Sequence, residues 1–299
     1  MSSVTGAALQ TWRRSQLARG RGAAAALDWL LEIEAGVPWV QLQRTYLEPE
    51  VQLSLRTPLE RLEMLWSKHC EQHHPLQYLT GRCPWRDFEL EVCPAVLIPR
   101  QETELLVELA LALGEQQAGP PLRWADLGTG SGCIALALAA AWPASRGWAV
   151  DLSAAALAVA RANGERLQAV ERLQWCQGSW WEPLEALVGS LQMVLSNPPY
   201  IPTSVYQQLD PLVREHEPRL ALDGGEDGLD CVREIVAGAK RFLAPGGWLL
   251  MELHHDQAAA VQHLLLAAGL ENIKLASDLE GKSRFAQAQA PSNYLQAVS

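Results

Sequence analysis

The fold class is decided by the stretch Leu122-Arg123-Trp124-Ala125-Asp126-Leu127-Gly128-Thr129-Gly130-Ser131-Gly132. Its first half is a short, mostly apolar segment of strand length, and its second half carries a glycine at every other position. The segment that follows, residues 133–141, is almost wholly apolar and long enough for a buried helix. Glycine accepts positive φ angles and lets a ligand approach the backbone and a helix N-terminus closely. The stretch therefore predicts a strand, a ligand-binding loop and a helix in succession.

The same alternation continues to the C-terminus. Further strands are predicted at residues 147–151, 173–176, 191–195 and 248–253, and helices at 154–162, 229–243 and 256–268. Residues 273–276 and 285–288 are expected to finish the sheet as an antiparallel edge pair. Strands that alternate with helices are typical of a doubly wound α/β sheet. We therefore predict a Rossmann-like, seven-stranded α/β domain over residues 97–299.

The N-terminal part lacks this alternation of strands and helices. Residues 1–75 show apolar residues at helical spacing and predict a small all-helical bundle, interpreted as a docking module. Within it, residues 49–53 are read as a helical turn, and Thr57 is expected to cap the helix that starts at Pro58. Residues 85–92 alternate like a half-exposed strand, and residues 76–96 are predicted to form a β-hairpin linker. After the linker, Glu102 or Thr103 is expected to cap the next helix.

Composition narrows the classes of partner. The chain has 299 residues, a net charge of −10 and 48% hydrophobic residues, which is enough for a sizeable core. A protein that binds duplex nucleic acid usually shows a basic footprint, so a protein or small-molecule substrate is favoured and no direct nucleic-acid binding is expected. No apolar run approaches the roughly 20 residues of a membrane span.

Cysteine and histidine spacing gives no sign of a metal or disulfide framework. The six cysteines are scattered without a C-x-x-C pair, which favours a reducing cytoplasm as the compartment. His69 and His73 are four residues apart on a predicted helix, but no second ligand cluster accompanies them. A solvated helix end explains them better, and no metal is expected.

Two acidic residues narrow the choice of ligand for the glycine loop. The dinucleotide fingerprint G-x-G-x-x-G fails because Cys133 takes the place of the third glycine, and no Lys-Ser/Thr pair follows as in a Walker loop. Asp126 precedes the loop, where it can help to orient a cationic head. Asp151 ends the second strand, where a carboxylate can accept from both ribose hydroxyls, although a cap for the next helix is the alternative. An adenosyl ligand with an amino acid and a sulfonium, S-adenosylmethionine, matches this pattern better than NAD.

The fourth predicted strand ends in a second motif, Asn197-Pro198-Pro199-Tyr200. Proline fixes φ and donates no backbone N–H, so the neighbouring carbonyls are free to accept other donors. A rigid corner with acceptors and a flat ring suits a planar group that carries N–H donors. A plain turn explains the tetrapeptide equally well, since Asn-Pro is a common turn starter.

Together these motifs give the chain a family likeness. It resembles class I S-adenosylmethionine-dependent methyltransferases, and more closely the peptide chain release factor N5-glutamine methyltransferases of the HemK/PrmC family. The segments that carry the likeness are Pro75-Leu76-x-Tyr78-Leu79-Thr80-Gly81, Leu97-Ile98-Pro99-Arg100, Asp126 to Gly132, Val150-Asp151, Ser196-Asn197-Pro198-Pro199-Tyr200-Ile201, Glu217-Pro218 and Pro245-Gly246-Gly247. Gln101, Ser179 and His254 stand where the family commonly has other residues.

The resemblance implies roles for named residues. Gly128, Thr129, Gly130, Ser131 and Gly132 would hold the methionine part of the cofactor, Asp151 the ribose and Trp180 the adenine. Asn197 would lie between cofactor and substrate. With Arg100, the residues Asn197, Pro198, Pro199 and Tyr200 would bind the substrate glutamine, which in this family belongs to a Gly-Gly-Gln motif of release factors.

The expected catalysis is positioning. The Asn197 side-chain oxygen and the Pro198 carbonyl would accept the two amide N–H bonds of the glutamine, and Tyr200 would hold the amide plane. Two other substrates stay open for the same corner, namely a glutamine of a ribosomal protein and the N6 amine of adenine in a nucleic acid. A non-catalytic docking protein that only binds the cofactor is the remaining alternative.

Overall fold

The protein is described by a computed structural model over residues 2–19, 23–115 and 122–293. The chain divides into two compact units. The first comprises Met1–Arg82 and Asp210–His216, and the second comprises Cys83–Leu209 and Glu217–Ser299. Among the helices of the described ranges, none combines the length and the apolar character that a bilayer crossing requires.

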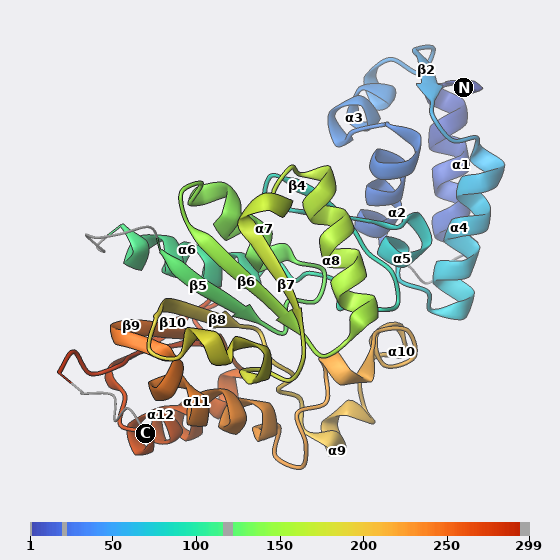
Figure 1. The fold of residues 1–299 in the computed structure, drawn as a ribbon. Coiled ribbons are helices and arrows are strands. Elements are labelled where there is room, and N and C mark those ends of the chain that lie inside the picture. The colour runs from blue at the N-terminus through green and yellow to red at the C-terminus, as the bar shows by residue number, and fades with distance from the viewer. Residues whose placement is uncertain (1, 20–22, 116–121, 294–299) are drawn as a thin grey trace. The chain divides into compact units, whose positions relative to one another are not determined.

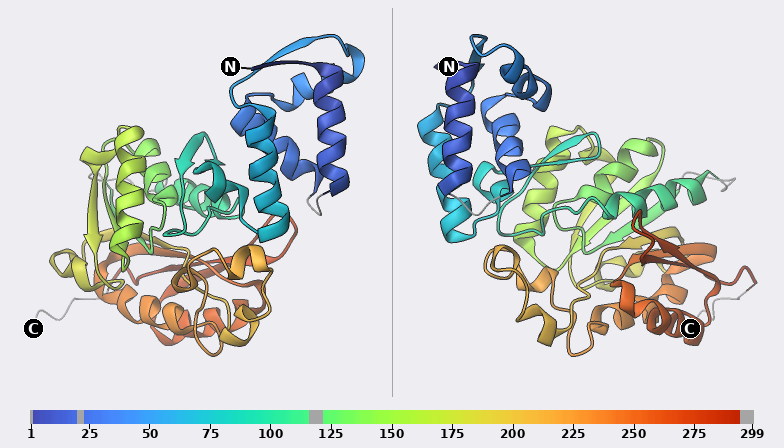
Figure 2. Two further views of the ribbon diagram at one scale, coloured as in Figure 1. Left: turned by 90° about the vertical axis from the view of Figure 1, so that its right-hand side faces the viewer. Right: turned by 180° about the vertical axis from the view of Figure 1, so that it is seen from behind.

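The first unit is mainly helical (Figure 2). Leucines from several helices and the Trp66 ring form its buried core, as the helical spacing in the sequence predicts. Its helical elements are α1 (Gly6–Arg19), α2 (Ala24–Leu30), the π-helical turn η1 (Leu31–Ala35), α3 (Trp39–Leu47), α4 (Leu59–Gln72), α5 (Leu76–Thr80) and α10 (Pro211–Arg214).

Two local predictions in this unit are wrong. Residues 52–55 form a strand, β2 (Gln52–Leu55), which pairs antiparallel with β1 (Ser2–Thr5). Leu53 and Leu55 are buried while Gln52 and Ser54 are exposed, so this segment has the two-residue period of a strand. Thr57 caps no helix either, because α4 has Pro58 at its N-cap with no side-chain cap.

The second unit is built on a seven-stranded sheet. The strand order is β10-β11-β9-β8-β5-β6-β7. Strands β7, β6, β5, β8 and β9 pair in parallel, and β11 pairs antiparallel with both β9 and β10. The strands are β5 (Arg123–Leu127), β6 (Arg146–Asp151), β7 (Leu173–Gln177), β8 (Leu191–Ser196), β9 (Leu243–Glu252), β10 (Glu271–Ser277) and β11 (Ser283–Gln289). A separate hairpin, β3 (Arg82–Trp85) with β4 (Phe88–Glu91), precedes the sheet.

Helices cover both faces of this sheet (Figure 1). One face packs against α6 (Thr103–Gly114), α7 (Cys133–Ala141) and α8 (Ala154–Arg166), and the other against α11 (Asp230–Phe242) and α12 (Ala258–Ala267). Neighbouring strand residues divide between the two cores: Met193 joins one and Val194 the other. Burial on both sides explains why the strands read as continuous apolar runs. The predicted Rossmann-like α/β fold is confirmed.

The remaining short elements connect these layers. They are α9 (Thr203–Tyr206) and the 3-10 turns η2 (Val170–Arg172), η3 (Glu182–Leu187), η4 (Arg219–Ala221) and η5 (His255–Gln257). The turn η5 begins with a capping box on His254, two residues before the start of the helix predicted at 256–268.

The order of the strands creates a switch point. The chain leaves β5 towards β6 on one side of the sheet, and later returns to the other side of β5 as β8. In open α/β sheets, ligands bind where the carboxyl ends of strands diverge in this way. Leu127, the last residue of β5, is paired with Ser196, the last residue of β8. The glycine loop and the Asn-Pro-Pro-Tyr corner therefore begin side by side.

The sheet should tolerate no side chain at Gly147. A Cβ there would lie 2.3 Å from ring atoms of the buried Trp124. We expect Gly147→Ala to lower the free energy of unfolding by about 1–3 kcal/mol through overpacking. Combining it with Trp124→Phe, which removes the ring atoms in conflict, should give less destabilisation than the sum of the two single variants in urea unfolding. An additive double variant would contradict this packing account.

Candidate active site

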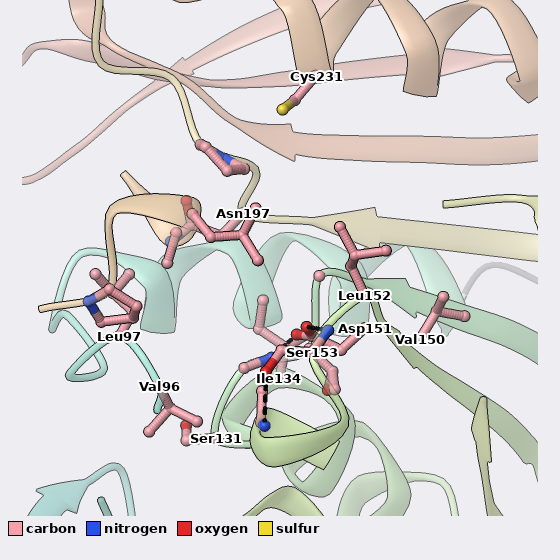
Figure 3. A pocket seen from close by; sticks show the side chains of 18 of the residues that line it. Val96, Leu97, Ser131, Ile134, Val150, Asp151, Leu152, Ser153, Asn197 and Cys231 are labelled. Carbon is pink, nitrogen blue, oxygen red and sulfur yellow. Dashed lines mark hydrogen bonds between the residues drawn. The ribbon is translucent and has the colours of Figure 1, made fainter. Parts of the chain in front are cut away.

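A cavity of about 310 Å³ opens at the carboxyl ends of the central strands (Figure 3). Its walls come from the segment before α6, the glycine loop, the ends of β6, β7 and β8, and the start of α11. In the view of Figure 3, Asp151, Leu152 and Ser153 lie on one side of it, and Asn197 and Cys231 on another. All of its lining residues belong to the second unit.

The glycine loop follows β5 as predicted. Gly128, Gly130 and Gly132 all have positive φ, at 77°, 55° and 85°. A Cβ on Gly132 would lie 3.1 Å from the Ala160 side chain, so this glycine permits close packing of α8. A Cβ on Gly130 would meet nothing within 4 Å, which leaves the backbone there open to the cavity. The loop thus combines a tight turn with an accessible backbone.

Asp151 connects the glycine loop to the next helix. One carboxylate oxygen accepts the Gly130 amide at 2.9 Å and the other accepts the Ser153 amide at 2.8 Å. Burial raises the pKa of Asp151, and these two amides act in the opposite direction. Each carboxylate oxygen has a second lone-pair site for a further donor. Because Asp151 lines the cavity, those sites are available to a diol.

Trp180 forms another wall of the cavity. Its φ of 43° lies in the left-handed region, which is uncommon for a bulky residue. The ring lies next to Gly128, since a Cβ there would be 3.4 Å from Trp180 Cζ3. Strained residues of this kind concentrate at ligand sites, where the surrounding structure holds them in place. The neighbouring Ser179 lines the cavity and donates its backbone amide to Glu182.

Asp126 lies beneath the glycine loop and is fully buried. Its Oδ2 accepts the Thr129 hydroxyl at 2.7 Å, while its Oδ1 has no hydrogen-bond partner among the described residues. Burial raises the pKa of Asp126 to about 7, although the Thr129 hydroxyl and the Ala135 backbone amide act in the opposite direction. Asp126 does not line the cavity. It places a titratable negative charge directly behind the loop.

Hydrogen bonds fix the Asn-Pro-Pro-Tyr corner at both ends. The Ser196 hydroxyl, just before it, donates to the Leu127 carbonyl at 2.7 Å. The Tyr200 hydroxyl donates to Glu252 at 3.1 Å, and the Tyr200 carbonyl accepts from the Gln257 amide at 2.9 Å. Asn197 Nδ2 donates to the Thr103 hydroxyl at 3.1 Å. Within the described part of the chain, no donor reaches Asn197 Oδ1 or the Pro198 carbonyl.

Arg100 lines the cavity but is already paired. Its guanidinium lies 2.6 Å from the carboxylate of Glu217, whose side chain is only 2% exposed. The other oxygen of Glu217 accepts the Ile98 amide at 3.1 Å. The pair joins the segment before α6 to the segment that carries Pro218, another wall of the cavity. Its visible role is to hold two walls together.

The structure thus brings most of the predicted site residues together. Those that line the cavity are Arg100, Gly128, Thr129, Gly130, Ser131, Asp151, Trp180, Asn197 and Pro199. Four others, Asp126, Gly132, Pro198 and Tyr200, are not among its lining residues. Thr103, Cys231 and Glu234 line it without having been predicted. Glu102 or Thr103 was expected to cap α6. Glu102 occupies the N-cap position, but no side chain forms a cap hydrogen bond there.

Histidines gather at two places in the described residues, in and just after α4 and at the turn η5. His69 Nδ1 lies 2.9 Å from the His74 carbonyl oxygen. The possible ligand atoms of His254, His255 and Asp256 lie within 4.8 Å of one another, and they are consecutive in the chain. His254 Nδ1 already accepts the Asp256 amide as a helix cap. No metal site is assigned to this turn.

Comparison with known proteins now adds the family. Residues 103–225 match the family described as the methyltransferase small domain. A release factor glutamine methyltransferase from Prochlorococcus marinus is 44% identical over 280 residues, covering 94% of this chain and 95% of that protein. The chain belongs to the release factor glutamine methyltransferase family. A relative of the same name from Gloeobacter violaceus is 46% identical over 257 residues, covering 85% of this chain and 87% of that protein.

Solved structures agree on the fold. The hMettl16 catalytic domain has a TM-score of 0.53 at 15% identity, covering 78% of this chain and 81% of that chain. A methyltransferase from Pyrococcus furiosus has a TM-score of 0.50 at 15% identity, covering 69% of this chain and 90% of that chain. At such identities the likeness extends to the architecture alone.

As a member of this family, the protein is an S-adenosylmethionine-dependent methyltransferase. Its cavity fits that cofactor. The open backbone at Gly130 and the spare acceptor sites of Asp151 suit an amino acid and a ribose. Asp126 Oδ1 and Ser131 Oγ are buried polar atoms without a partner among the described residues, next to this backbone. A buried carboxylate with one oxygen left without a partner is costly, so a cationic ligand at the loop would relieve it.

The charge of Asp126 should therefore control cofactor affinity. We expect Asp126→Asn to weaken S-adenosylmethionine binding at pH 8 by about tenfold or more, since a charge pair is lost. In the unsubstituted protein, affinity should fall as the pH drops below about 7, because Asp126 then becomes protonated and neutral. Asp126→Asn should lose that part of the pH dependence in isothermal titration calorimetry.

A neutral ligand provides the control for Asp126. The compound 5′-methylthioadenosine keeps the adenine and ribose but lacks the ammonium and sulfonium charges, so its affinity should change less than threefold in Asp126→Asn. Equal losses for both ligands would show instead that the substitution distorts the loop.

Proposed function

We propose that this protein transfers a methyl group from S-adenosylmethionine to the side-chain amide nitrogen of a glutamine in peptide chain release factors, within a Gly-Gly-Gln motif. One observation carries the proposal. The Asn197 side-chain oxygen and the Pro198 carbonyl are two acceptors without a protein donor, adjacent to the glycine loop. A primary amide has two N–H donors, and relatives that share 44% and 46% of the aligned residues are named release factor glutamine methyltransferase.

The chemical problem is the weak nucleophile. The lone pair of an amide nitrogen is delocalised into the carbonyl, and no side chain of the corner is a strong base. The cofactor supplies an electrophilic methyl group on its sulfonium. Asn197 and Pro198 orient the glutamine nitrogen, and such alignment can contribute up to about 7–11 kcal/mol.

The same two acceptors also stabilise the transition state electrostatically. Positive charge develops on the nitrogen during transfer, and fixed oxygen dipoles that face it stabilise that charge without reorganising. This is the reverse polarity of an oxyanion hole. The nitrogen then loses one proton. Tyr200, fixed by Glu252 and Gln257, keeps the corner rigid throughout.

Residues 1–75 are assigned the docking of the release factor. The outer face of α3 carries four exposed apolar side chains, namely Trp39, Val40, Tyr46 and Leu47, with exposures between 56% and 85%. They repeat at one- and seven-residue intervals, so they lie on one side of the helix. Clustered exposed aromatic and aliphatic side chains mark protein-binding surfaces. Residues 76–96 connect this docking part to the catalytic residues 97–299.

The charge of the chain and its cysteine pattern bear on the substrate class and the compartment. The net charge of −10 opposes binding to nucleic acid, so adenine in DNA or RNA is not an expected substrate. The cytoplasm is the predicted compartment.

Mass spectrometry of a release factor tests the proposal directly. After incubation with the protein and S-adenosylmethionine, the Gly-Gly-Gln peptide should gain the mass of one methylene group, and fragmentation should place it on the glutamine side chain. A glutamine-to-alanine release factor should gain nothing. Methylation of RNA or DNA, or of another glutamine, with an unmodified release factor would overturn the proposal.

A substitution of Asn197 should affect catalysis without affecting cofactor binding. Asn197→Ala should reduce release factor methylation by roughly a hundredfold or more, the usual scale for a lost catalytic dipole. Its affinity for S-adenosylmethionine should stay within a few-fold of the unsubstituted protein. Full turnover by this variant would contradict the assigned role of Asn197.

A further inference from the structure

A chain of side-chain hydrogen bonds runs behind the wall of the cavity. Asn197 Nδ2 donates to Thr103 Oγ1 at 3.1 Å, and Thr103 Oγ1 donates to Glu252 Oε2 at 2.7 Å. The Tyr200 hydroxyl donates to Glu252 Oε1 at 3.1 Å. The chain joins the start of α6 and the end of β9 to both ends of the Asn-Pro-Pro-Tyr corner. Thr103 and Glu252 are separated by 149 residues in sequence.

The chemistry of these groups gives the chain a direction. An ionised carboxylate only accepts hydrogen bonds, and each hydroxyl has a single proton to give. Glu252 accepts one hydrogen bond on each carboxylate oxygen, from the Thr103 hydroxyl and from the Tyr200 hydroxyl. The oxygen of Thr103 can then only accept from Asn197. The group that Asn197 turns towards Thr103 must be its NH₂, which leaves Oδ1 on the other side of the amide.

We propose that Thr103, held by Glu252, is a positioning residue that orients the Asn197 amide with its oxygen towards the substrate nitrogen. This inference rests on the proposed function, because it assigns to Oδ1 the task of accepting from the substrate amide. An Asn197 side chain turned by 180° about its last bond would present NH₂ to a substrate NH₂. Two donors facing each other would make no hydrogen bond and would repel the developing positive charge.

The burial of Glu252 supports a functional reason for the chain. Glu252 is 1% exposed and Thr103 is 2% exposed. Among the described residues, Glu252 forms no salt bridge, and the nearby Arg284 is paired with Asp278. A buried carboxylate without a cation is costly, and an apolar side chain of similar size would cost less. Both of its oxygens are instead used to direct hydroxyl groups that contact or belong to the corner.

The pKa directions agree with this assignment. Burial and the adjacent Glu252 raise the pKa of Tyr200, so its hydroxyl remains a donor at neutral pH. Burial raises the pKa of Glu252, whereas the Thr103 and Tyr200 hydroxyls and, to a smaller extent, the charge of Arg284 lower it. The two hydroxyls thus support the charge that gives the chain its direction.

Two substitutions at Thr103 distinguish orientation from packing. Thr103→Val keeps the branched shape but removes the hydroxyl, whereas Thr103→Ser keeps the hydroxyl and removes a methyl group. We expect Thr103→Val to lower kcat for release factor methylation by about 10- to 100-fold. Thr103→Ser should stay within about threefold of the unsubstituted protein. Thr103 orients Asn197 towards the substrate and not towards the cofactor. The affinity for S-adenosylmethionine should therefore change less than threefold in both variants.

Nuclear magnetic resonance gives a readout that is independent of activity. The side-chain NH₂ signals of Asn197 can be assigned by their absence in Asn197→Ala. Their exchange with solvent should be at least tenfold faster in Thr103→Val than in Thr103→Ser or the unsubstituted protein. Thermal unfolding of both Thr103 variants serves as the check that each remains folded.

The outcomes separate this inference from the proposed function. If the unsubstituted protein leaves the release factor unmodified, the proposed function fails, and the NMR comparison still tests the orientation. If it methylates the release factor and Thr103→Val turns over within threefold of it, the positioning role is wrong. Equal losses of kcat in Thr103→Val and Thr103→Ser would also overturn it, because only packing would then explain the effect.

Discussion

The parallel pairing of β5 with β8 is the constraint on which the site depends. It sets Leu127 opposite Ser196, and the Ser196 hydroxyl closes the pair on the Leu127 carbonyl at 2.7 Å. The glycine loop and the Asn197 corner begin at the next residue of each strand, although 69 residues separate them in sequence. Asp151 ends β6 on one side and Glu252 ends β9 on the other. The strand order therefore arranges the whole site along one edge of the sheet.

Three acidic side chains at this edge have different surroundings and hence different uses. Asp151 accepts two backbone amides, and Glu252 accepts two hydroxyls. Asp126 keeps one oxygen without a partner among the described residues. Burial raises the pKa of all three. The two backbone amides hold Asp151 as an acceptor for neutral hydroxyl groups. The hydroxyls on Glu252 orient the Asn197 amide, and the charge of Asp126 attracts a cation.

Much of this could be predicted from sequence, because the signals are local. Apolar runs gave the strands, and the glycine loop and Asp151 follow strand ends at short, fixed spacing. Contacts between residues that lie far apart along the chain could not be predicted in this way. The strand at 52–55 has its partner at residues 2–5, and Arg100 is paired with Glu217, 117 residues away. Thr103, at the start of a helix, looks like a cap until Glu252 is placed beside it.

The site also shows why a methyltransferase of this kind places unfavourable groups in its core. Among the described residues, Asp126 Oδ1 and Ser131 Oγ are buried without partners, and the buried Glu252 forms no salt bridge. Each reduces the stability of the protein alone. A cofactor with an ammonium and a sulfonium supplies the charge that Asp126 lacks, so its binding energy is coupled to folding. Glu252 needs no such ligand, because its two hydroxyl donors are internal. Cofactor affinity and the orientation of Asn197 are thus supported by separate acids, and either can change without the other.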